Sequence, residues 1–494
     1  MKQLPKLLSK TKIMQGYQCL KNIYLSVHNK EIKIEITADQ QALFDQGSSV
    51  GEYARKFFPG GVLVDNKPWD FFGSLKKTRD LLRQEVEIIY EAAFEYQGCY
   101  ARADVIKYSK ETKRWTVYEV KSSTKLKDEY IDDVGLQTWI MKNSGLEIEK
   151  VYVLHINSEC IYPKLDLLFK EIDVTEILNA KYDKISIQLN TIFTSLRQEN
   201  LPNVDIGPQC YSPYECSYKQ HCFAEKNIPE VSVFNLPKIG EKKWDLYQQG
   251  IIELSDKRLT DLAENQNRMI DVHRTQKRYT NSDLIKNEIT SWEYPFTYLD
   301  FETIAPAIPR YVGTRPYQQV PFQFSAHLQN NRNEKTSHHE YLHTDNSDPR
   351  PLLIEKLLKA CGTKGSIIAY YAQFEIARIK ELADFSSEHS AELLSLLERF
   401  KDPLPLIREA IYDIGFKGSY SLKNVAPSLL GNQYSYSGLL VENGTAAQRA
   451  FEQIISDSIS LDQRKVLIDG LLEYCKQDTF VMVQLIEYLL NYSN

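Results

Sequence analysis

Three consecutive stretches with the pattern of β-strands constrain the fold of this chain more than any other feature. They are EIIYEAAFEY, YARADVIKY and WTVYEVKSS, between Glu87 and Ser123, and the turns QGC and SKETKR separate them. Turn-bounded runs rich in β-branched and aromatic residues predict strands. A helical pattern over Leu43–Phe58 precedes them, and a helix over Val134–Lys142 and a strand over Val151–Ile156 follow. This part of the chain is therefore predicted to be an α/β layer around a mixed sheet with buried middle strands.

A second α/β pattern begins near Phe296. It predicts strands FTYLDFET, PFQFSAHL and HHEYLH, helix PLLIEKLLKA, strand GSIIAYYA, helix QFEIARIKELA and a long amphipathic helix over Asp462–Leu490. A loop rich in Pro, Gly and Cys ends the first pattern, and a mostly helical connector follows it. Because 494 residues exceed what one hydrophobic core supports, we expect separate domains over residues 1–230 and 293–494, joined by a connector over residues 231–292.

The overall charge excludes a broad basic surface. The formal net charge is -6, so a site for a polyanion such as nucleic acid must be local. No stretch is long and apolar enough to span a membrane, and the basic start lacks the apolar core of a signal peptide. We therefore expect a cytoplasmic protein without a membrane partner. The 31 tyrosines offer surfaces on which bases can stack.

The cysteines are predicted to bind metal rather than to form disulfides, because the cytoplasm is reducing. Cys210, Cys216 and Cys222 lie in one Pro/Gly loop with five residues between neighbours, and a fourth ligand is best sought in Cys19. Four thiolates favour an iron–sulfur cluster or zinc. The remaining cysteines are predicted to be small buried hydrophobes: Cys99, Cys160, Cys361 and Cys475.

A first group of charged residues lies on two of the predicted strands. Asp104 is in the middle of one strand, and Glu119 is in the middle of its expected hairpin partner. Strand alternation places Glu119 and Lys121 on one face. Two carboxylates and an ammonium can hold Mg²⁺ and position a water for phosphodiester hydrolysis. A solvated hairpin is the alternative interpretation of the same letters.

With Gln137 on the following helix, this group resembles the PD-(D/E)xK nuclease signature, in particular its RecB and CRISPR-associated RecB-like branch. The resemblance implies a restriction-endonuclease-like mixed sheet. It also implies that Asp104, Glu119 and the Val120 carbonyl bind the metal, that Lys121 orients or activates water, and that Gln137 positions the site.

Two further features resemble that branch. The leading helix GSSVGEYARKFF supplies Glu52, although the His often found near that place is absent. One cysteine before the nuclease core and three after it resemble the cluster-bearing RecB-like nucleases. This resemblance implies a 4Fe-4S cluster that clamps the two ends of the domain, with zinc as the alternative.

A second group of acidic residues lies in the C-terminal pattern. Asp300 and Glu302 are two apart on a strand, and Tyr474 and Asp478 are four apart on a helix, so each pair shares a face. Glu375 lies where a strand ends and a helix begins. Such carboxylates can hold two Mg²⁺ or Mn²⁺ ions, and a tyrosine can orient the attacking water. A surface pair on a helix is the alternative for the tyrosine and its partner.

Together and in this order, these residues resemble the tyrosine-bearing branch of the DEDD 3′ exonucleases. The resemblance implies an RNase H-like domain in which Asp300, Glu302, Glu375 and Asp478 bind metal and Tyr474 orients water. Glu375 stands where the family usually has Asp. The stretch DIGFKGSYSLKNVAPSLLG resembles the family's Ser-Leu helix start, where Asp413 is a candidate supporting acid.

Over nearly its whole length the chain resembles a bacterial family of uncharacterised two-domain proteins, through LSKTKIMQGYQCLKNIYL, YLDFETIAPAIPRYVGTRPYQQVPFQFS and LLEYCKQDTFVMV. We expect a nuclease with two active sites that acts on DNA, preferentially on single strands or free ends, in repair or in defence against foreign DNA. The alternatives are a nucleic-acid-binding scaffold with one inactive site and an RNA-trimming enzyme. The connector segment NRMIDVHRTQKRY is either a solvated basic face or a track for a phosphate backbone.

Overall fold

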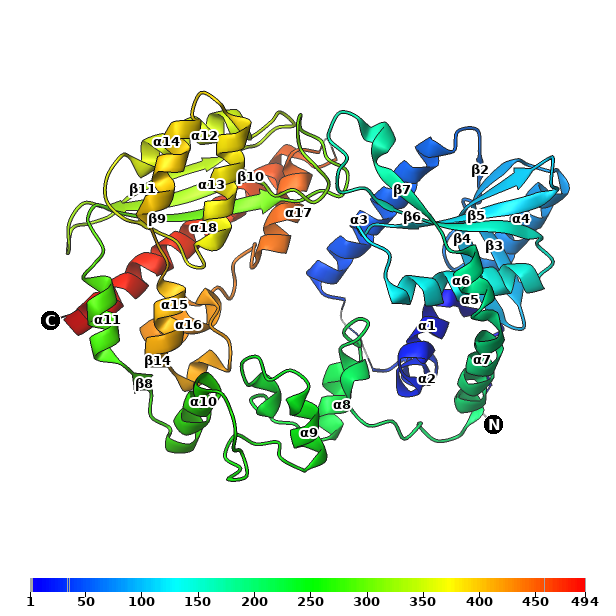
Figure 1. The fold of residues 1–494 in the computed structure, drawn as a ribbon, viewed down its shortest axis with the longest axis horizontal. Helices are drawn as coiled ribbons and strands as arrows, with labels where there is room; N and C mark the ends of the chain where they lie inside the picture. Colours follow the sequence, from blue (N-terminus) through cyan, green and yellow to red (C-terminus); the bar gives the residue numbers. More distant parts are fainter. Residues whose placement is uncertain (1–2, 33, 35, 457, 494) are drawn as a thin grey trace. The chain divides into compact units, whose positions relative to one another are not determined.

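The computed structural model describes residues 3–32, 34, 36–456 and 458–493. It divides into two compact units (Figure 1). Unit 1 comprises Met1–Asn227 and Pro306–Tyr317, and unit 2 comprises Ile228–Ala305 and Gln318–Asn494. The connector expected over residues 231–292 lies within unit 2 in this division, and a short segment from the C-terminal half belongs to unit 1. No helix in the described part of the chain is long and apolar enough to cross a lipid bilayer.

Unit 1 is built on a seven-stranded mixed sheet in the order β2-β3-β4-β5-β6-β7, with β1 paired to β4. The strands are β1 (Leu8–Ser9), β2 (Val62–Leu63), β3 (Ile88–Tyr96), β4 (Cys99–Ser109), β5 (Arg114–Lys121), β6 (Ile148–Ile156) and β7 (Phe169–Asp173). The pairs β3–β4 and β4–β5 are antiparallel, whereas β5 and β6 are parallel because a helix connects them. The three strands predicted between residues 87 and 123 are confirmed as β3, β4 and β5.

Helices pack around this sheet. They are α1 (Lys10–Gln18), α2 (Leu20–His28), α3 (Ala38–Ala54), α4 (Phe71–Arg83), α5 (Asp128–Asn143), α6 (Thr175–Asn179), α7 (Tyr182–Arg197) and α8 (Lys219–Glu225). One large core forms between α5, α7 and the sheet, through residues such as Val134, Ile140, Leu189 and Val117. In Figure 1, α1 and α2, in dark blue, lie beside α7, so the start of the chain is held close to the sheet.

Unit 2 is built on a five-stranded sheet in the order β11-β10-β9-β12-β13. Its strands are β9 (Phe296–Ile304), β10 (Val320–Gln329), β11 (Ser337–Leu342), β12 (Ile367–Ile368) and β13 (Phe400–Lys401), and β8 (Tyr279–Thr280) pairs separately with β14 (Ile411–Tyr412). The first three strands form an antiparallel meander, and β12 and β13 add to it in parallel. The strand predicted over GSIIAYYA is shorter than expected, because only Ile367–Ile368 pair before the chain turns.

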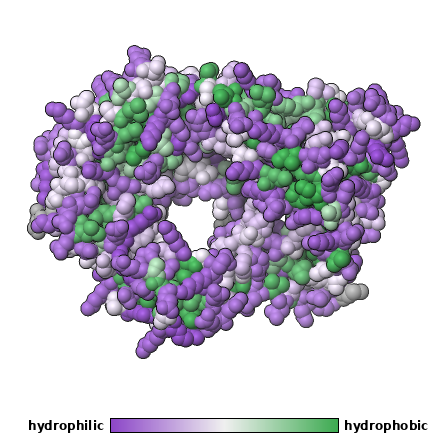
Figure 2. Space-filling model, in the orientation of Figure 1, coloured by the Kyte–Doolittle hydropathy of each residue, from purple (hydrophilic) through white to green (hydrophobic). Residues whose placement is uncertain are grey.

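Helices cover both faces of the unit 2 sheet (Figure 1). They are α9 (Lys242–Gln248), α10 (Glu264–Thr275), α11 (Ser282–Ile289), α12 (Arg350–Cys361), α13 (Gln373–Phe385), α14 (Ser390–Leu396), α15 (Pro403–Ala410), α16 (Leu422–Leu430), α17 (Gly444–Ile454) and α18 (Leu461–Leu490). One core joins α12, α13 and α14 to the sheet, for example Leu353 and Leu382 against Phe324. The other joins α18 and the connector helices to the opposite face. On the face seen in Figure 2, hydrophilic residues predominate and hydrophobic residues gather in separate patches.

Candidate active sites

The first candidate site lies where strands β4 and β5 of unit 1 separate. The last pair of the β4–β5 ladder is Val105–Tyr118, so the ladder stops next to Asp104, which has no partner on β5 in this ladder. Beyond that point Asp104 Oδ2 accepts a hydrogen bond from the backbone nitrogen of Val120 at 2.6 Å. The other end of β4 pairs instead with β1, through Leu8–Cys99 and Ser9–Tyr100. The strands thus diverge at the aspartate, and β1 brings the start of α1 to the sheet.

Two lysines converge there on the carboxylates of Glu119 and Asp133. Lys121 Nζ lies 2.8 Å from Glu119 Oε1 and 2.5 Å from Asp133 Oδ2. Lys10 Nζ, at the first residue of α1, lies 2.9 Å from the same oxygen of Glu119 and 2.9 Å from Asp133 Oδ2. Sequence reasoning placed Lys121 here but missed Lys10, which is distant in sequence and enters the site only because β1 pairs with β4.

Helix α5 supplies the remaining polar groups. Gln137 Nε2 donates to Glu119 Oε2 at 2.7 Å, and its Oε1 accepts from Lys10 at 2.6 Å. Asp133 lies one turn earlier on the same face of α5, so both side chains point toward β5. The structure therefore brings together all four predicted residues of this site, Asp104, Glu119, Lys121 and Gln137, and adds Asp133, whose i, i+4 spacing to Gln137 was the signal that could have found it.

The electrostatics of this site combine excess negative charge with two buried ammoniums. Burial, together with Glu119 and Glu91, holds the pKa of Asp104 well above its ordinary value. Burial opposes the charged form of Lys121, but Glu119 and Asp133 outweigh it and hold the pKa of Lys121 well above its ordinary value. In the same way Lys10 and Lys121 outweigh burial and lower the pKa of Asp133. A divalent cation beside Asp104 would therefore relieve charge repulsion.

Glu91 on β3 is a further acidic group that sequence reasoning missed. Its backbone has a φ of 57°, a left-handed conformation that is uncommon for a residue other than glycine. Its side chain lies 3.4 Å from Arg102 Nε and 3.6 Å from Arg55 Nη2. Burial raises the pKa of Glu91, and these arginines oppose that rise. Glu52, expected from the leading helix, is exposed on α3.

The second candidate site lies on strand β9 and helix α18 of unit 2. Asp300 and Glu302 are on one face of β9, and one donor atom from each lies within 4.8 Å of the other and of Cys475 Sγ. The thiol is 3.6 Å from Asp300 Oδ2. Cys475 is buried, as predicted, and α18 packs its thiol directly against the acidic strand.

Glu375 adds a third carboxylate from the first turn of α13. It is 3% exposed, and its Oε2 atom is buried without a hydrogen-bond partner among the described residues. With Asp300 and Glu302 it lines a cavity of about 420 Å³. A buried carboxylate oxygen without a partner is costly, so such a group either stays protonated or binds a cation.

Burial raises the pKa of all four predicted carboxylates of this site, and repulsion by neighbouring carboxylates adds to the rise in three of them. Burial, followed by Asp478 and Glu302, holds the pKa of Asp300 well above its ordinary value, and burial with Asp478 does the same for Glu302. Burial raises the pKa of Glu375 to about 8. Burial raises the pKa of Asp478 to about 6, although hydrogen bonds from Tyr436 and Tyr474 and the charge of Lys423 oppose it.

Two tyrosines and a lysine complete this site. Tyr436 Oη donates to Asp478 Oδ1 at 2.6 Å, and the rings of Tyr436 and Tyr474 lie 6.3 Å apart. Lys423 Nζ stands over both rings, 5.2 Å and 5.1 Å from their centroids, and donates to the Glu442 carbonyl. Tyr474 and Asp478 were predicted, whereas Tyr436 and Lys423 were not. Lys423 lies in the stretch DIGFKGSYSLKNVAPSLLG, whose Ser-Leu helix start was the signal that could have found it.

Asp413 lies outside this acidic cluster. Its carboxylate pairs with Arg278 Nε at 2.7 Å, accepts from Ser428 Oγ at 2.5 Å and caps the short helix that follows it. Asp413 therefore fixes the segment before α16. Arg278, one of the basic residues of the connector segment, is held in that ion pair.

The four predicted cysteine ligands surround one small cavity in unit 1. Gln18 ties the start of the chain to the cysteine loop, with Nε2 donating to the carbonyls of Gln209 at 2.8 Å and Tyr214 at 2.7 Å. Burial raises the pKa of the Cys216 thiol to about 11 and also raises that of Cys210. Among the described residues, no three of the four sulfurs lie within 4.8 Å of one another.

Fold and sites together define an α/β protein with two buried carboxylate clusters, one in each compact unit. A protein-family profile described as Domain of unknown function (DUF2779) matches residues 297–421. That region contains Asp300, Glu302 and Glu375 but ends before α18.

Two known proteins are similar to parts of the chain. The uncharacterized protein UU173 of Ureaplasma parvum serovar 3 is 27% identical over 220 residues, which cover 39% of this chain and 31% of that protein. The chain thus matches about a third of the length of this relative. The crystal structure of an alkaline exonuclease from Laribacter hongkongensis aligns with 39% of this chain and 90% of its own, at 12% identity and a TM-score of 0.24.

Proposed function

We propose that this protein is a metal-dependent nuclease with a separate active site in each unit. The observation that carries the proposal is the cluster of Asp300, Glu302, Glu375 and Asp478, in which burial raises every pKa and repulsion adds to the rise in the first three. Groups perturbed in this way beside a cavity are typical of functional sites. Carboxylate oxygens are the donors that Mg²⁺ and Mn²⁺ prefer.

In unit 2 the proposed reaction is removal of nucleotides from a 3′ end, on an RNase H-like fold. Bound divalent cations would supply charge stabilisation at the attacking and leaving oxygens. Tyr474 orients the attacking water, and Tyr436 holds Asp478 through their 2.6 Å hydrogen bond. The antiparallel meander extended by two parallel strands, with helices on both faces, supports the proposed fold.

In unit 1 the proposed reaction is phosphodiester hydrolysis at a PD-(D/E)xK site. Asp104 and Glu119 would bind the cation, Gln137 fixes the second oxygen of Glu119, and Lys121 orients the water. Lys10 supports a second candidate function for this unit. Its ammonium, together with that of Lys121, already balances Glu119 and Asp133 without a bound metal, which favours a site that binds nucleic acid without cutting it.

We also propose that Cys19, Cys210, Cys216 and Cys222 hold a 4Fe-4S cluster. A tetrahedral zinc with bonds of about 2.3 Å would bring its sulfurs to about 3.8 Å from one another. In a cluster each thiolate binds a different iron, so the sulfurs stand farther apart. The four thiols surround one small cavity, which supports a shared group, and the metal content of the purified protein distinguishes the cluster from zinc.

The substrate we propose is DNA, as single strands or frayed ends. The test is degradation of a 5′-labelled single strand by the purified protein with Mg²⁺ or Mn²⁺. We expect a ladder of shortened products that EDTA abolishes and that a blocked 3′ end prevents in a Lys121→Ala variant. Equal attack on free and blocked 3′ ends by that variant would contradict the proposal for unit 2. An RNA strand of the same sequence distinguishes an RNA-trimming enzyme.

A further inference from the structure

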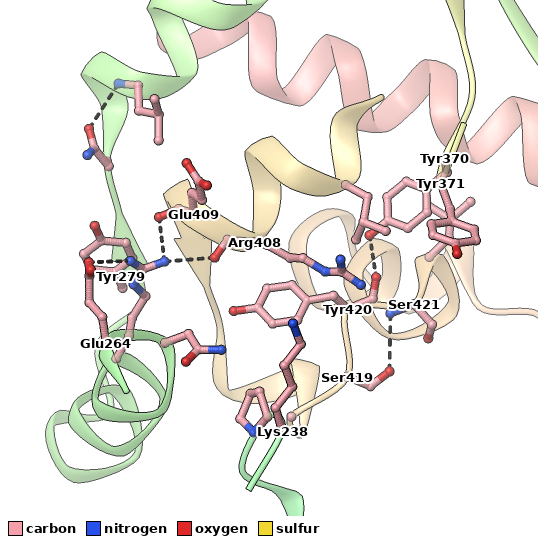
Figure 3. A pocket seen from close by; sticks show the side chains of 18 residues that line it. Lys238, Glu264, Tyr279, Tyr370, Tyr371, Arg408, Glu409, Ser419, Tyr420 and Ser421 are labelled. Carbon is pink, nitrogen blue, oxygen red and sulfur yellow. Dashed lines mark hydrogen bonds and ion pairs between the residues drawn. The ribbon is translucent and has the colours of Figure 1, made fainter. Parts of the chain in front are cut away.

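A second and larger cavity in unit 2 adjoins the acidic cluster. It has a volume of about 1220 Å³, above the roughly 300–1,000 Å³ of ordinary small-molecule pockets. Tyr370 and Tyr371 line both this cavity and the one that holds Glu375. Figure 3 shows these two tyrosines at one end, Tyr420 and Lys238 near the middle, and Tyr279 at the other end.

The cavity extends along the connector helix α10. Arg268 and Tyr279 line it and also line a third cavity of about 390 Å³, whose wall includes Lys277. Each cavity therefore shares wall residues with the next, so that the three form a row from the acidic cluster to the basic connector segment. A row of adjoining cavities of this kind is suited to a long, flexible polymer rather than to a compact ligand.

The walls carry aromatic rings that are positioned by the backbone. Tyr371 is 56% exposed and has a φ of 66°, a strained conformation for a non-glycine residue. Asp402 holds it, because Oδ1 accepts from the Tyr371 nitrogen and Oδ2 from the Ala372 nitrogen, both at 3.0 Å. Tyr370 Oη donates to the Tyr420 carbonyl at 2.6 Å and fixes that segment. The ring of Tyr371 is thus exposed although its backbone is strained, which is the feature expected of a side chain that contacts a ligand.

The cavity also offers uncommitted positive charge. The side chains of Lys238 and Arg408 line it, and in the described part of the chain neither makes an ion pair or a hydrogen bond. Arg268, by contrast, is held by Glu264 at 3.0 Å and by the carbonyl of Arg408 at 2.9 Å. Glu409 also lines the cavity, so its field is mixed and weakly positive. Aromatic faces with interspersed cations are the features by which proteins bind single strands without sequence preference.

We propose that this cavity, which we call the connector groove, binds a single-stranded polynucleotide and guides its 3′ end to the acidic cluster. Tyr371 and Tyr420 stack on bases, and Lys238 and Arg408 contact phosphates. The proposal rests on the proposed exonuclease function of unit 2 for the direction of the strand. Binding itself does not depend on hydrolysis, so the two are tested separately.

The first experiment locates the strand. A single strand of about ten nucleotides carrying a photoreactive base is crosslinked to the full-length protein in EDTA, and the modified peptides are identified. We expect peptides that contain Tyr371 or Tyr420. Crosslinks found only in unit 1 would contradict the proposal that the connector groove binds the strand. Strands of DNA and of RNA with one sequence show which sugar the groove accepts.

The second experiment measures affinity by fluorescence anisotropy as a function of salt. Removing two phosphate contacts with Lys238→Gln and Arg408→Gln should weaken binding about tenfold and reduce the slope of log affinity against log salt by about 1.4. The matched control is Lys356→Gln with Lys359→Gln, two exposed lysines on α12 that do not line the groove. Equal effects of the two pairs would show a general charge effect and overturn the proposal.

A Tyr371→Leu variant tests stacking independently of charge. It should weaken binding by roughly fivefold or more without changing the salt slope. Unchanged thermal unfolding of each variant shows that the fold is retained. If the groove binds as expected but no cation supports nucleotide release, the proposed function fails and the groove stands. If release occurs and none of these substitutions alters binding, the groove fails and the function stands.

Discussion

The two carboxylate clusters differ in what neutralises them. In unit 1, Lys10 and Lys121 lie within 2.9 Å of Glu119 or Asp133, so most of the negative charge is matched by the protein itself. In unit 2, Asp300, Glu302 and Glu375 lie in a cavity wall, and Glu375 keeps a buried oxygen without a partner among the described residues. The comparison teaches that a site whose carboxylates are mostly paired with lysines depends less on a bound metal than a site whose carboxylates mostly face one another.

The largest expected effect is on hydrolysis. Asp300→Asn should lower nucleotide release from a 3′ end by about a thousandfold or more, because it removes a proposed ligand. Lys121→Ala should leave that release intact and abolish the separate activity of unit 1. Both are measured on end-labelled single strands with Mg²⁺, and Asp469→Asn, an exposed position on α18, is the control. If Asp300→Asn leaves every product unchanged, unit 2 binds without cutting.

The proposed cysteine site sharpens the comparison, because a group bound there is expected to stabilise unit 1 and not unit 2. Anaerobically purified protein should be brown, and Cys216→Ser should bleach it and lower the unfolding free energy of unit 1 by about 3 kcal/mol or more, since metal ligation joins two distant segments. Absorbance, iron content and thermal unfolding measure this. The 3′ activity of unit 2 should persist in the variant. Colourless wild type with stoichiometric zinc would contradict the iron assignment and keep the ligands.

Removing one lysine should convert the first site into one that resembles the second. Lys10→Met leaves Glu119 and Asp133 with a single ammonium and should lower the metal-free unfolding free energy of unit 1 by about 3 kcal/mol. Added Mg²⁺ should restore part of that loss. The control is Lys12→Met on the same helix, whose ammonium donates to the Ser26 carbonyl rather than to a carboxylate. Equal losses in both variants would show that Lys10 acts through packing.

The smallest expected effect is a pH dependence of metal-free unit 2. The pKa of Glu375 is raised to about 8, above its ordinary value of 4.5, so its contribution to stability is complete below about pH 4.5 and is lost as pH rises to about 8. Glu375→Gln should remove a slope of up to about 1.4 kcal/mol per pH unit from unfolding measured in EDTA. Glu381→Gln, on the same helix, is the control. Mg²⁺ should reverse the trend, because it binds ionised carboxylates; a slope unchanged by Glu375→Gln contradicts the assignment.

Local sequence patterns were sufficient to predict the longer strands, β3 to β6 in unit 1 and β9 to β11 in unit 2, and the residues that share a face, but not the short strands β1, β2, β7 and β13. Alternation on β5 placed Glu119 beside Lys121, and spacing on β9 and α18 paired Asp300 with Glu302 and Tyr474 with Asp478. These predictions succeed because a strand or helix fixes the relative direction of its own side chains. The domain boundaries, the metal ions and the cluster remain predictions.

Only the tertiary structure decided which segments that are distant in the sequence come into contact. Lys10 reaches Glu119 because β1 pairs with β4, and Cys475 reaches Asp300 because α18 packs on β9. The connector groove likewise depends on α10 packing beside the segment around Tyr420. No local periodicity encodes such contacts, because they arise when separate elements bury their apolar faces against one another. The sequence by itself therefore determined the elements and the direction of their side chains, whereas their packing determined the charge balance of each site.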